Sequence, residues 1–264
     1  MKKHDAWRRT LRLVMLIAFL SLPMAARGQD LFEIQVYPYD TVPPHQTMVE
    51  LHMNFFPSGT KQAAPGEFIN DNQFHLTLEV THGLTKYFEL AGYVVTAYVP
   101  DIGPKFAGAR IRPRFRLPDD WHLPFRVSVS TEVGFNKHQF EANTITLEIR
   151  PILERELGRW YLSLNPVIAK ALRGPDAGSA PTFEPGVKVS YAVTKKVEPG
   201  VEYYADTGPI THFETPRDQH HLIFPTLDLN VSPDWELNFG VGRGLTGSSE
   251  RWVVKWIIGY RFKF

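Results

Sequence analysis

The chain contains no cysteine, which excludes disulfide bridges, thiol catalysis and anchoring through a lipid-modified cysteine. It also lacks a long hydrophobic run. The longest, from Leu13 to Leu22, is too short to cross a bilayer as a helix, which requires about 20 residues. Because 43% of the residues are nevertheless hydrophobic, the apolar side chains must be spread over many short segments.

The first residues have the pattern of a secretory signal peptide. Five basic residues precede the run at 13–22, and the small residues Ala25, Ala26 and Gly28 follow it. A basic start, a short apolar run and a small-residue cleavage site predict export. We therefore expect residues 1–28 to be removed, which leaves Gln29 as the first residue.

A strongly basic charge is also missing once this segment is removed. The whole chain has 29 basic and 28 acidic residues, and residues 1–28 hold six of the basic and one of the acidic ones. The remaining 23 basic and 27 acidic residues give a net charge of −4. This balance argues against nucleic acid as a partner.

The clearest pattern that is present lies at the carboxyl end, where residues 251–264 alternate. Its apolar positions are Trp252, Val254, Trp256, Ile258, Tyr260, Phe262 and Phe264, with basic residues among the positions between them. Strict alternation predicts an extended strand with one apolar face. An edge strand of a soluble sandwich would have the same pattern. A final amphipathic strand that ends in Tyr260, Phe262 and Phe264 resembles the assembly signal of bacterial outer-membrane barrels, and this resemblance implies the barrel-assembly machinery as a partner during biogenesis.

Twelve alternating segments can be read along the chain. They cover residues 47–56, 74–81, 87–99, 107–117, 124–135, 143–154, 161–170, 183–193, 197–205, 221–231, 236–245 and 251–264. Proline cannot donate to a strand ladder, so we expect the prolines within these segments to mark bulges or strand ends. They are Pro113, Pro124, Pro151, Pro166, Pro185, Pro199 and Pro225.

Tight turns recur near residues 85, 119, 158, 195 and 234, and generally longer polar loops lie between them. A repeat of this length also occurs in solenoids and propellers, but here each unit is a two-stranded hairpin without a helix. Short turns that alternate with longer loops are typical of transmembrane barrels. The sequence predicts an all-β fold: residues 47–264 form a closed antiparallel up-and-down transmembrane β-barrel of about twelve strands, with short periplasmic turns, longer extracellular loops and a periplasmic lead-in at 29–46.

The positions of aromatic residues agree with an orientation in which the tight turns lie at one membrane surface. Trp121, Trp160 and Trp235 each close a tight turn, where an amphipathic ring would lie at the level of the lipid headgroups. Packing in a protein core is the alternative. Together with Trp252, Trp256 and Tyr260, these residues are expected at the membrane interface, which makes outer-membrane lipid a partner.

Three sequence segments carry a resemblance to a more specific family: Glu79–Leu90, Val197–Asp206 and Phe239–Leu245. They resemble outer-membrane proteins of the meta-pathway phenol-degradation family, from about residue 72 to the end. These segments are turn-and-strand patterns rather than catalytic or ligand-binding motifs. The resemblance implies an outer-membrane barrel and, by association, transport of small aromatic or apolar compounds.

A charged inner face is expected to line the barrel. Arg110, Arg112, Arg114 and Arg116 alternate along one strand, and a cation facing lipid at the bilayer midplane costs about 2–4 kcal/mol. The other candidates for the lumen are Arg126, Glu132, Glu148, Arg150, Glu198, Glu202, Asp228 and Glu236. These charges either create a transverse field that selects solutes or pair across strands and fill the barrel.

Motifs for catalysis or cofactor binding are weak. Outer-membrane phospholipase A, also a twelve-stranded barrel, has a His-x-Ser-Asn-Gly phrase that this chain lacks, and no His lies two residues before Ser128 or Ser130. Neighbouring strand residues face opposite sides, so His220 and His221 share a metal only if they lie in a loop. We expect no enzyme activity, no cofactor and no metal. The sequence favours a passive channel for small solutes; a sealed structural or loop-interaction barrel is the alternative, and a lipid-modifying enzyme is less favoured.

Overall fold

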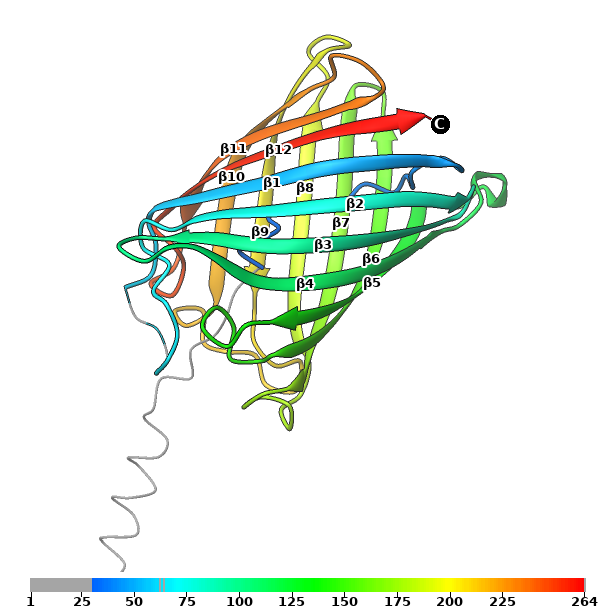
Figure 1. Ribbon diagram of the computed structural model, residues 1–264. Coiled ribbons are helices and arrows are strands. Elements are labelled where there is room, and N and C mark those ends of the chain that lie inside the picture. The colour runs from blue at the N-terminus through cyan, green and yellow to red at the C-terminus, as the bar shows by residue number, and fades with distance from the viewer. Residues whose placement is uncertain (1–29, 62, 64, 264) are drawn as a thin grey trace, which may run out of the picture.

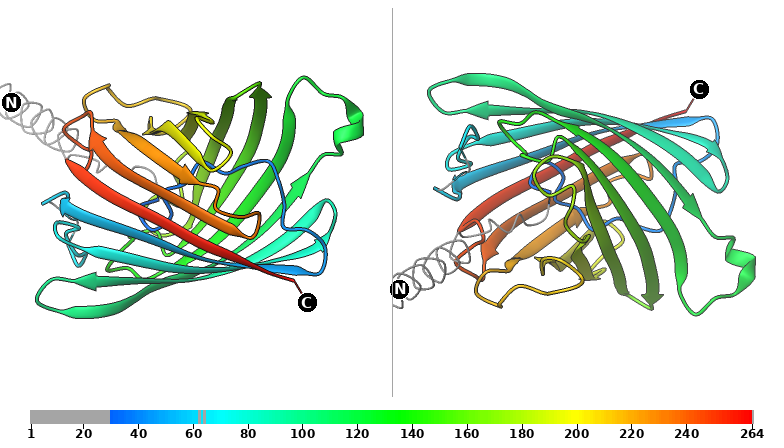
Figure 2. Two further views of the ribbon diagram at one scale, coloured as in Figure 1. Left: turned by 90° about the horizontal axis from the view of Figure 1, so that it is seen from above. Right: turned by 90° about the horizontal axis from the view of Figure 1, so that it is seen from below.

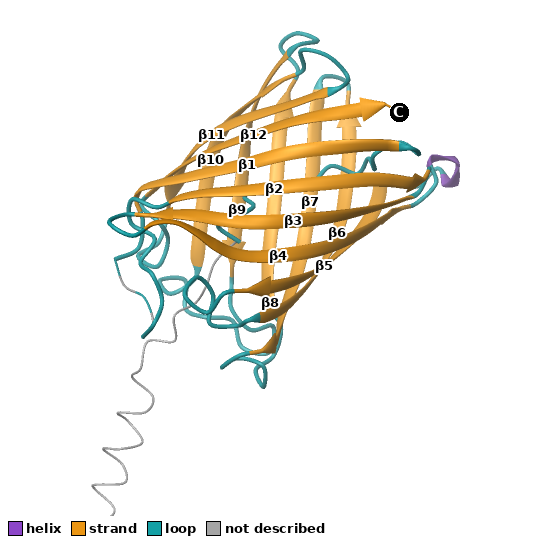
Figure 3. Cartoon of the chain, viewed as in Figure 1, coloured by secondary structure: helices purple, strands orange, loops and turns teal. Residues whose placement is uncertain are grey.

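A computed structural model describes residues 30–61, 63 and 65–263, and it is an almost purely β structure (Figure 1). The strands are β1 (Gln46–Ser58), β2 (Phe74–Thr85), β3 (Phe88–Val99), β4 (Gly103–Arg116), β5 (Arg126–Asn136), β6 (Ile145–Leu157), β7 (Trp160–Arg173), β8 (Thr182–Tyr191), β9 (Val197–Asp206), β10 (His220–Leu229), β11 (Trp235–Gly244) and β12 (Trp252–Lys263). A 3₁₀ turn, η1 (Asp119–Trp121), lies between β4 and β5 (Figure 3). No helix within the described ranges is long and apolar enough to cross a bilayer.

The strands form one closed antiparallel barrel in which each strand pairs with its neighbours in sequence. Closure is made by β1 and β12, whose register begins at Gln46 opposite Lys263 and reaches Ser58 opposite Trp252. The predicted closed twelve-stranded barrel is therefore confirmed. Because the first and last edges are joined, every strand has two partners and no edge strand remains.

The two faces of the barrel differ because side chains alternate along each strand. On β3, Val94 is 48% exposed whereas its neighbour Val95 is 2% exposed. The outer face carries exposed apolar side chains on every side of the barrel, among them Leu51, Leu78, Leu90, Val94, Ile111, Phe115, Val129, Ile149, Leu164, Val201, Val241 and Trp252. Most of the buried charged groups lie on the inner face.

Proline interrupts the strand ladder without ending the strands. Pro113 lies inside β4, and the β4–β5 pairing skips from Ile111 to Arg114. Pro225 lies inside β10, where the β10–β11 pairing skips from Ile223 to Thr226. Pro124 precedes β5 and Pro199 lies near the start of β9, but the expectation of bulges or strand ends was wrong for prolines such as Pro113 and Pro225. The missing amide donor is tolerated because the strand keeps its second partner, as Pro225 does opposite Val201.

Residues 30–45, here called the luminal segment, run through the interior of the barrel (Figure 2). Ile34 and Tyr39 are each 1% exposed. We expected a lead-in outside the barrel, and the structure corrects this for the described residues. The physical reason is that the segment is stabilised by side chains from many strands, a set of contacts that the local sequence does not reveal. The predicted signal peptide, residues 1–28, lies outside the described residues.

Gly83 on β2 allows the luminal segment to pass close to the wall before it enters β1. A Cβ atom at Gly83 would lie 2.1 Å from the carbonyl oxygen of Pro43 and 2.3 Å from that of Val42. Replacing Gly83 with Val should therefore destabilise the protein by about 1–3 kcal/mol, the usual cost of overpacking. The midpoint of denaturant unfolding measures this change.

Gly92 on β3 provides the matched control, because a Cβ atom there would meet nothing within 4 Å. Gly92→Val should change the free energy of unfolding by no more than about 0.5 kcal/mol, as expected for a surface substitution. Equal effects of the two substitutions would show that the close passage at Gly83 is unimportant.

Candidate functional site: the occupied lumen

The luminal segment packs its apolar side chains against two parts of the barrel wall. Phe32 belongs to a cluster with Tyr93 and Val95 of β3 and other small apolar residues. Ile34 and Val36 belong to a second cluster with Phe56, Tyr204, Leu222, Phe224 and Val253. Apolar burial on both sides therefore holds the segment across the width of the lumen.

The backbone of the segment is satisfied by side chains of the wall. Tyr37 is the clearest case: its N–H donates to Asn165 Oδ1 over 2.7 Å, and its carbonyl accepts from Ser163 and Asn165. Similar bonds join Asn54 and His75 to the Leu31 carbonyl, Thr77 to Phe32, Lys255 to Ile34, Arg150 to Gln35 and Arg114 to Pro38. A buried polar backbone needs such partners, so the wall is complementary to an extended chain.

The arginine ladder of β4 contacts carboxylates on both the wall and the segment. Arg110 contacts Asp30, Glu33 and Glu132. Arg112 contacts Glu79 and Glu89, and Arg114 lies 2.7 Å from Glu89. Arg116 reaches Asp40 over 2.8 Å. The four guanidinium groups are thus engaged in ion pairs.

Tyr37 lies among the guanidinium groups of Arg150 of β6 and of two arginines of the β4 ladder. The guanidinium carbon of Arg150 lies 4.2 Å from the centre of the Tyr37 ring, and those of Arg112 and Arg114 lie at 4.9 and 5.7 Å. Cations are attracted to the face of an aromatic ring. Tyr37 therefore adds an aromatic contact to the ion pairs between the segment and the arginines.

The opposite side of the lumen carries a second network, centred on Lys255. This side chain is fully buried and contacts Glu202. Lys188 lies 2.8 Å from Asp228 and 3.4 Å from Glu202. Each of these four charged groups therefore has a partner of opposite charge, as burial requires.

The remaining sequence-predicted charges take the following places. Arg150 lies 2.7 Å from Glu148, and Arg126 contacts Glu154 near the end of β6. Glu198 accepts a hydrogen bond from Ser190. Glu236 accepts one from Gln35 of the luminal segment over 2.9 Å.

Carboxylates exceed cations where the segment meets β1, β2 and β4. Glu50 of β1 lies directly opposite Glu79 of β2, and both are buried. Among the described residues, neither Glu50 nor Glu236 forms an ion pair. Like charges directly opposite each other destabilise a sheet, so this part of the lumen favours positive charge.

Sequence reasoning missed Glu33, Glu50, His52, Glu79 and Glu89 as members of this site. Alternation already placed His52 and Glu79 on the polar faces of their strands. No sequence signal showed that the segment carrying Glu33 would enter the barrel.

The aromatic candidates lie mostly on the outer face. Trp121 is 59% and Trp160 51% exposed, and the exposed group also includes Trp235, Trp252 and Tyr260. Tyr260 packs edge-on against Trp235 and Phe262, and Trp256 is partly buried. Their position at a membrane interface stays a prediction. So does the role of Tyr260, Phe262 and Phe264 as an assembly signal, and Phe264 lies outside the described residues.

The catalytic and metal alternatives weighed from the sequence have no matching geometry. The buried hydroxyls of Ser128 and Ser130 have no hydrogen-bond partner in the described part of the chain, so no base is positioned on either. His220 is buried and lies 3.8 Å from Glu250, whereas His221 contacts Tyr203 and Gln219. The two imidazoles therefore point to different sides of β10.

Comparison with known proteins supports the fold. No family model and no curated protein sequence matches the chain, so the narrower resemblance to the phenol-degradation family has no support from a family model. The chain is similar in structure to an outer membrane channel from Pseudomonas putida F1, with a TM-score of 0.61 and 13% identity over 87% of this chain and all of that one.

Two porins are also similar. The NanC porin gives a TM-score of 0.54 at 11% identity, covering 83% of this chain and 100% of that one. The KdgM porin in complex with disordered oligogalacturonate gives 0.50 at 11%, covering 82% and 99%. The chain therefore has the barrel fold found in these outer-membrane channels and porins.

Proposed function

We propose that this protein is a passive outer-membrane channel for small solutes whose polar lumen is occupied at rest by its own N-terminal segment. The supporting observation is a closed barrel with an apolar outer face and a charged inner face, a pattern typical of barrels that surround a pathway through lipid. Its similarity in fold to channels and porins agrees with this proposal. Export through a signal peptide cleaved after Gly28 and insertion by the barrel-assembly machinery belong to the same proposal.

Charge in the lumen would set the preference for solutes. Arg110, Arg112 and Arg114 are shared among five carboxylates, and Glu50 and Glu236 add two more without forming an ion pair among the described residues. A pore lined by an excess of carboxylates attracts cations and repels anions. We therefore expect cation selectivity when solutes pass.

Selectivity in planar bilayers tests this proposal. The double variant Glu50→Gln/Glu236→Gln should lower the cation-to-anion permeability ratio, because it replaces two carboxyl groups of the lumen with neutral amides of the same size. The reversal potential under a salt gradient measures the ratio. Glu156→Gln is the control, since its side chain is 62% exposed near the end of β6. A reversal potential that both variants leave unchanged would contradict a pathway past these carboxylates.

A sealed barrel is the second candidate, and the burial of the luminal segment favours it. In that case, function would reside in the loops outside the barrel. Conductance of the full chain and of a variant without the luminal segment tests this alternative. Both proteins must be folded, as shown by heat-modifiable migration in gels. The absence of current from both would support a sealed barrel. The similarity of this barrel to channels and porins favours transport over enzyme activity for this protein.

A further inference from the structure

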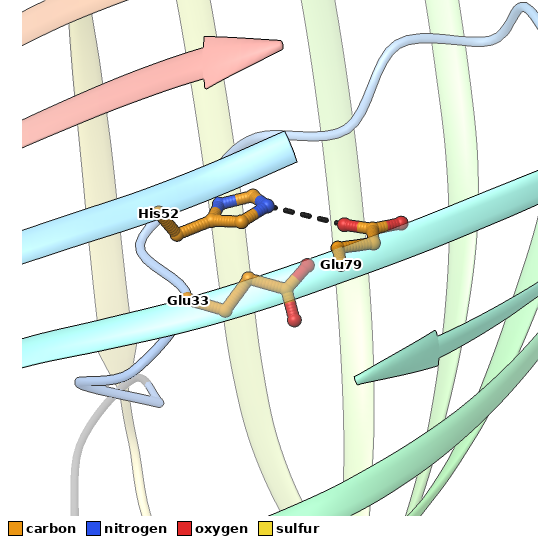
Figure 4. Close-up of side chains that lie close together, drawn as sticks. All are labelled: Glu33, His52 and Glu79. Atoms are coloured by element: carbon orange, nitrogen blue, oxygen red, sulfur yellow. Dashed lines mark hydrogen bonds and ion pairs between the residues drawn. The ribbon is translucent and has the colours of Figure 1, made fainter. Parts of the chain in front are cut away.

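We infer that Glu33, His52 and Glu79 form a site for a divalent metal of the zinc type, which fastens the luminal segment to the barrel wall. His52 comes from β1, Glu79 from β2 and Glu33 from the segment (Figure 4). All three are buried, and one ligand atom from each lies within 4.8 Å of those of the other two. A metal at this point would join three separate parts of the chain.

The distance between the two wall ligands suits a shared ion. His52 Nε2 lies 3.1 Å from Glu79 Oε2. In a tetrahedral zinc site with bonds of 2.0–2.2 Å, neighbouring ligand atoms are about 3.3 Å apart. Only small shifts are therefore needed for both atoms to bind one ion.

The two oxygens of Glu79 have separate neighbours. Oε1 accepts hydrogen bonds from Arg112 and from Thr81, the latter over 2.6 Å, while Oε2 faces His52. Partners of this kind orient a metal-binding carboxylate. Glu33 is oriented in a similar way, because the hydroxyl of Tyr37 donates to its Oε1.

One buried carboxyl group beside these residues lacks a partner within the described part of the chain. Glu50 is only 7% exposed and lies directly opposite Glu79, yet it has no hydrogen bond or ion pair among the described residues. Buried charges are normally paired or bound to metal, and a divalent cation would offset the repulsion between Glu50 and Glu79.

The ligand types indicate the class of metal. An imidazole nitrogen with carboxylate oxygens suits Zn²⁺, whereas Ca²⁺ and Mg²⁺ prefer oxygen ligands alone. Glu50, directly opposite Glu79 on the neighbouring strand, is a candidate for a fourth ligand. The inference concerns binding and does not require that the barrel conduct solutes.

Titration with ZnCl₂ tests the site directly. The full folded chain in detergent, first treated with a chelator, should bind one Zn²⁺ per chain in isothermal titration calorimetry. His52→Ala and Glu33→Gln should each weaken binding by more than about 100-fold, since even outer-shell partners of a metal are worth about 10–100-fold. The control is His82→Ala, because His82 is on the same hairpin but contacts Thr47 instead.

Glu33→Gln is the decisive variant, because Glu33 lies outside every strand and Arg110 keeps Asp30 and Glu132 as partners after the substitution. If His52→Ala does not regain heat-modifiable migration, Glu33→Gln alone decides. The inference is overturned if the unmodified chain binds no Zn²⁺, if Glu33→Gln binds it as tightly as the unmodified chain, or if Ca²⁺ binds equally well. Such a result would leave the proposed channel function standing, since conductance is measured without added metal.

Discussion

Deletion of residues 30–45 is expected to increase the single-channel conductance several-fold in planar bilayers. The segment fills the interior with buried side chains such as Ile34 and Tyr39, and its removal would leave an open lumen whose charged side chains attract water. A barrel of twelve strands lies between eight-stranded barrels, which side chains fill, and porins of 16–18 strands, which hold an aqueous channel. A twelve-stranded barrel without its luminal segment should therefore be wide enough to conduct ions.

A reversible lock gives a sharper form of this experiment. The Cβ position of Gly186 on β8 lies 3.5 Å from Val36 Cγ2 of the segment, which is close enough for a disulfide between Val36→Cys and Gly186→Cys after small adjustments. Because the chain has no other cysteine, no competing disulfide can form. The oxidised variant should stay at low conductance, and a reducing agent should restore the conductance of the unmodified chain.

The single variants Val36→Cys and Gly186→Cys control for the substitutions, and neither should respond to the reducing agent. Equal conductance before and after deletion of the segment, in folded barrels, would show that the segment does not limit the pathway. If oxidation and reduction of the double variant also give equal currents, the segment does not need to move for solutes to pass.

Replacing Arg112 with Met is expected to cost about 3–5 kcal/mol of unfolding free energy, the usual effect of removing one partner of a buried ion pair. Arg112 is 2% exposed and contacts Glu79, Glu89 and Tyr93. Its loss would leave Glu79 without its guanidinium partner. Urea unfolding of the refolded protein in lipid vesicles measures the change.

A double variant tests the ion pair itself, and the substitution of an arginine on the outer face is the control. Arg112→Met combined with Glu79→Gln should cost less than the sum of the single changes, because the second change removes a charge that the first leaves unpaired. Arg155→Met removes an exposed arginine that lies 5.7 Å from the Phe125 ring, and it should cost no more than about 1 kcal/mol. A similar loss for Arg112→Met and Arg155→Met would mean that the buried network contributes little.

Much of the wall could be predicted from the sequence, because the pattern that specifies each strand lies within that strand's own residues. Alternation of apolar and polar residues repeats in each strand, and the period of two determines which side chains face lipid and which face inward. The last strand shows this most clearly: Trp252 is exposed on the outer face while Lys255 is buried inside. Strand number, pairing order and closure all follow from the same pattern.

The contents of the lumen could not be predicted in the same way. The Leu31 carbonyl meets His75, and the Ile34 carbonyl meets Lys255 of the final strand. Contacts over such sequence separations leave no periodic signal. The segment also contains the prolines Pro38, Pro43 and Pro44, which read as an irregular linker when its partners are unknown.

The wall and the luminal segment are held by different kinds of bonds. Backbone ladders join the strands, whereas wall side chains such as Asn165 and Ser163 hold the segment at Tyr37. Water can replace those side-chain bonds one at a time while the ladders stay intact. The fold thus fixes its wall more firmly than its contents: a strand cannot leave without breaking the backbone ladders on both of its sides, whereas residues 30–45 share no ladder with the wall and are attached through side chains.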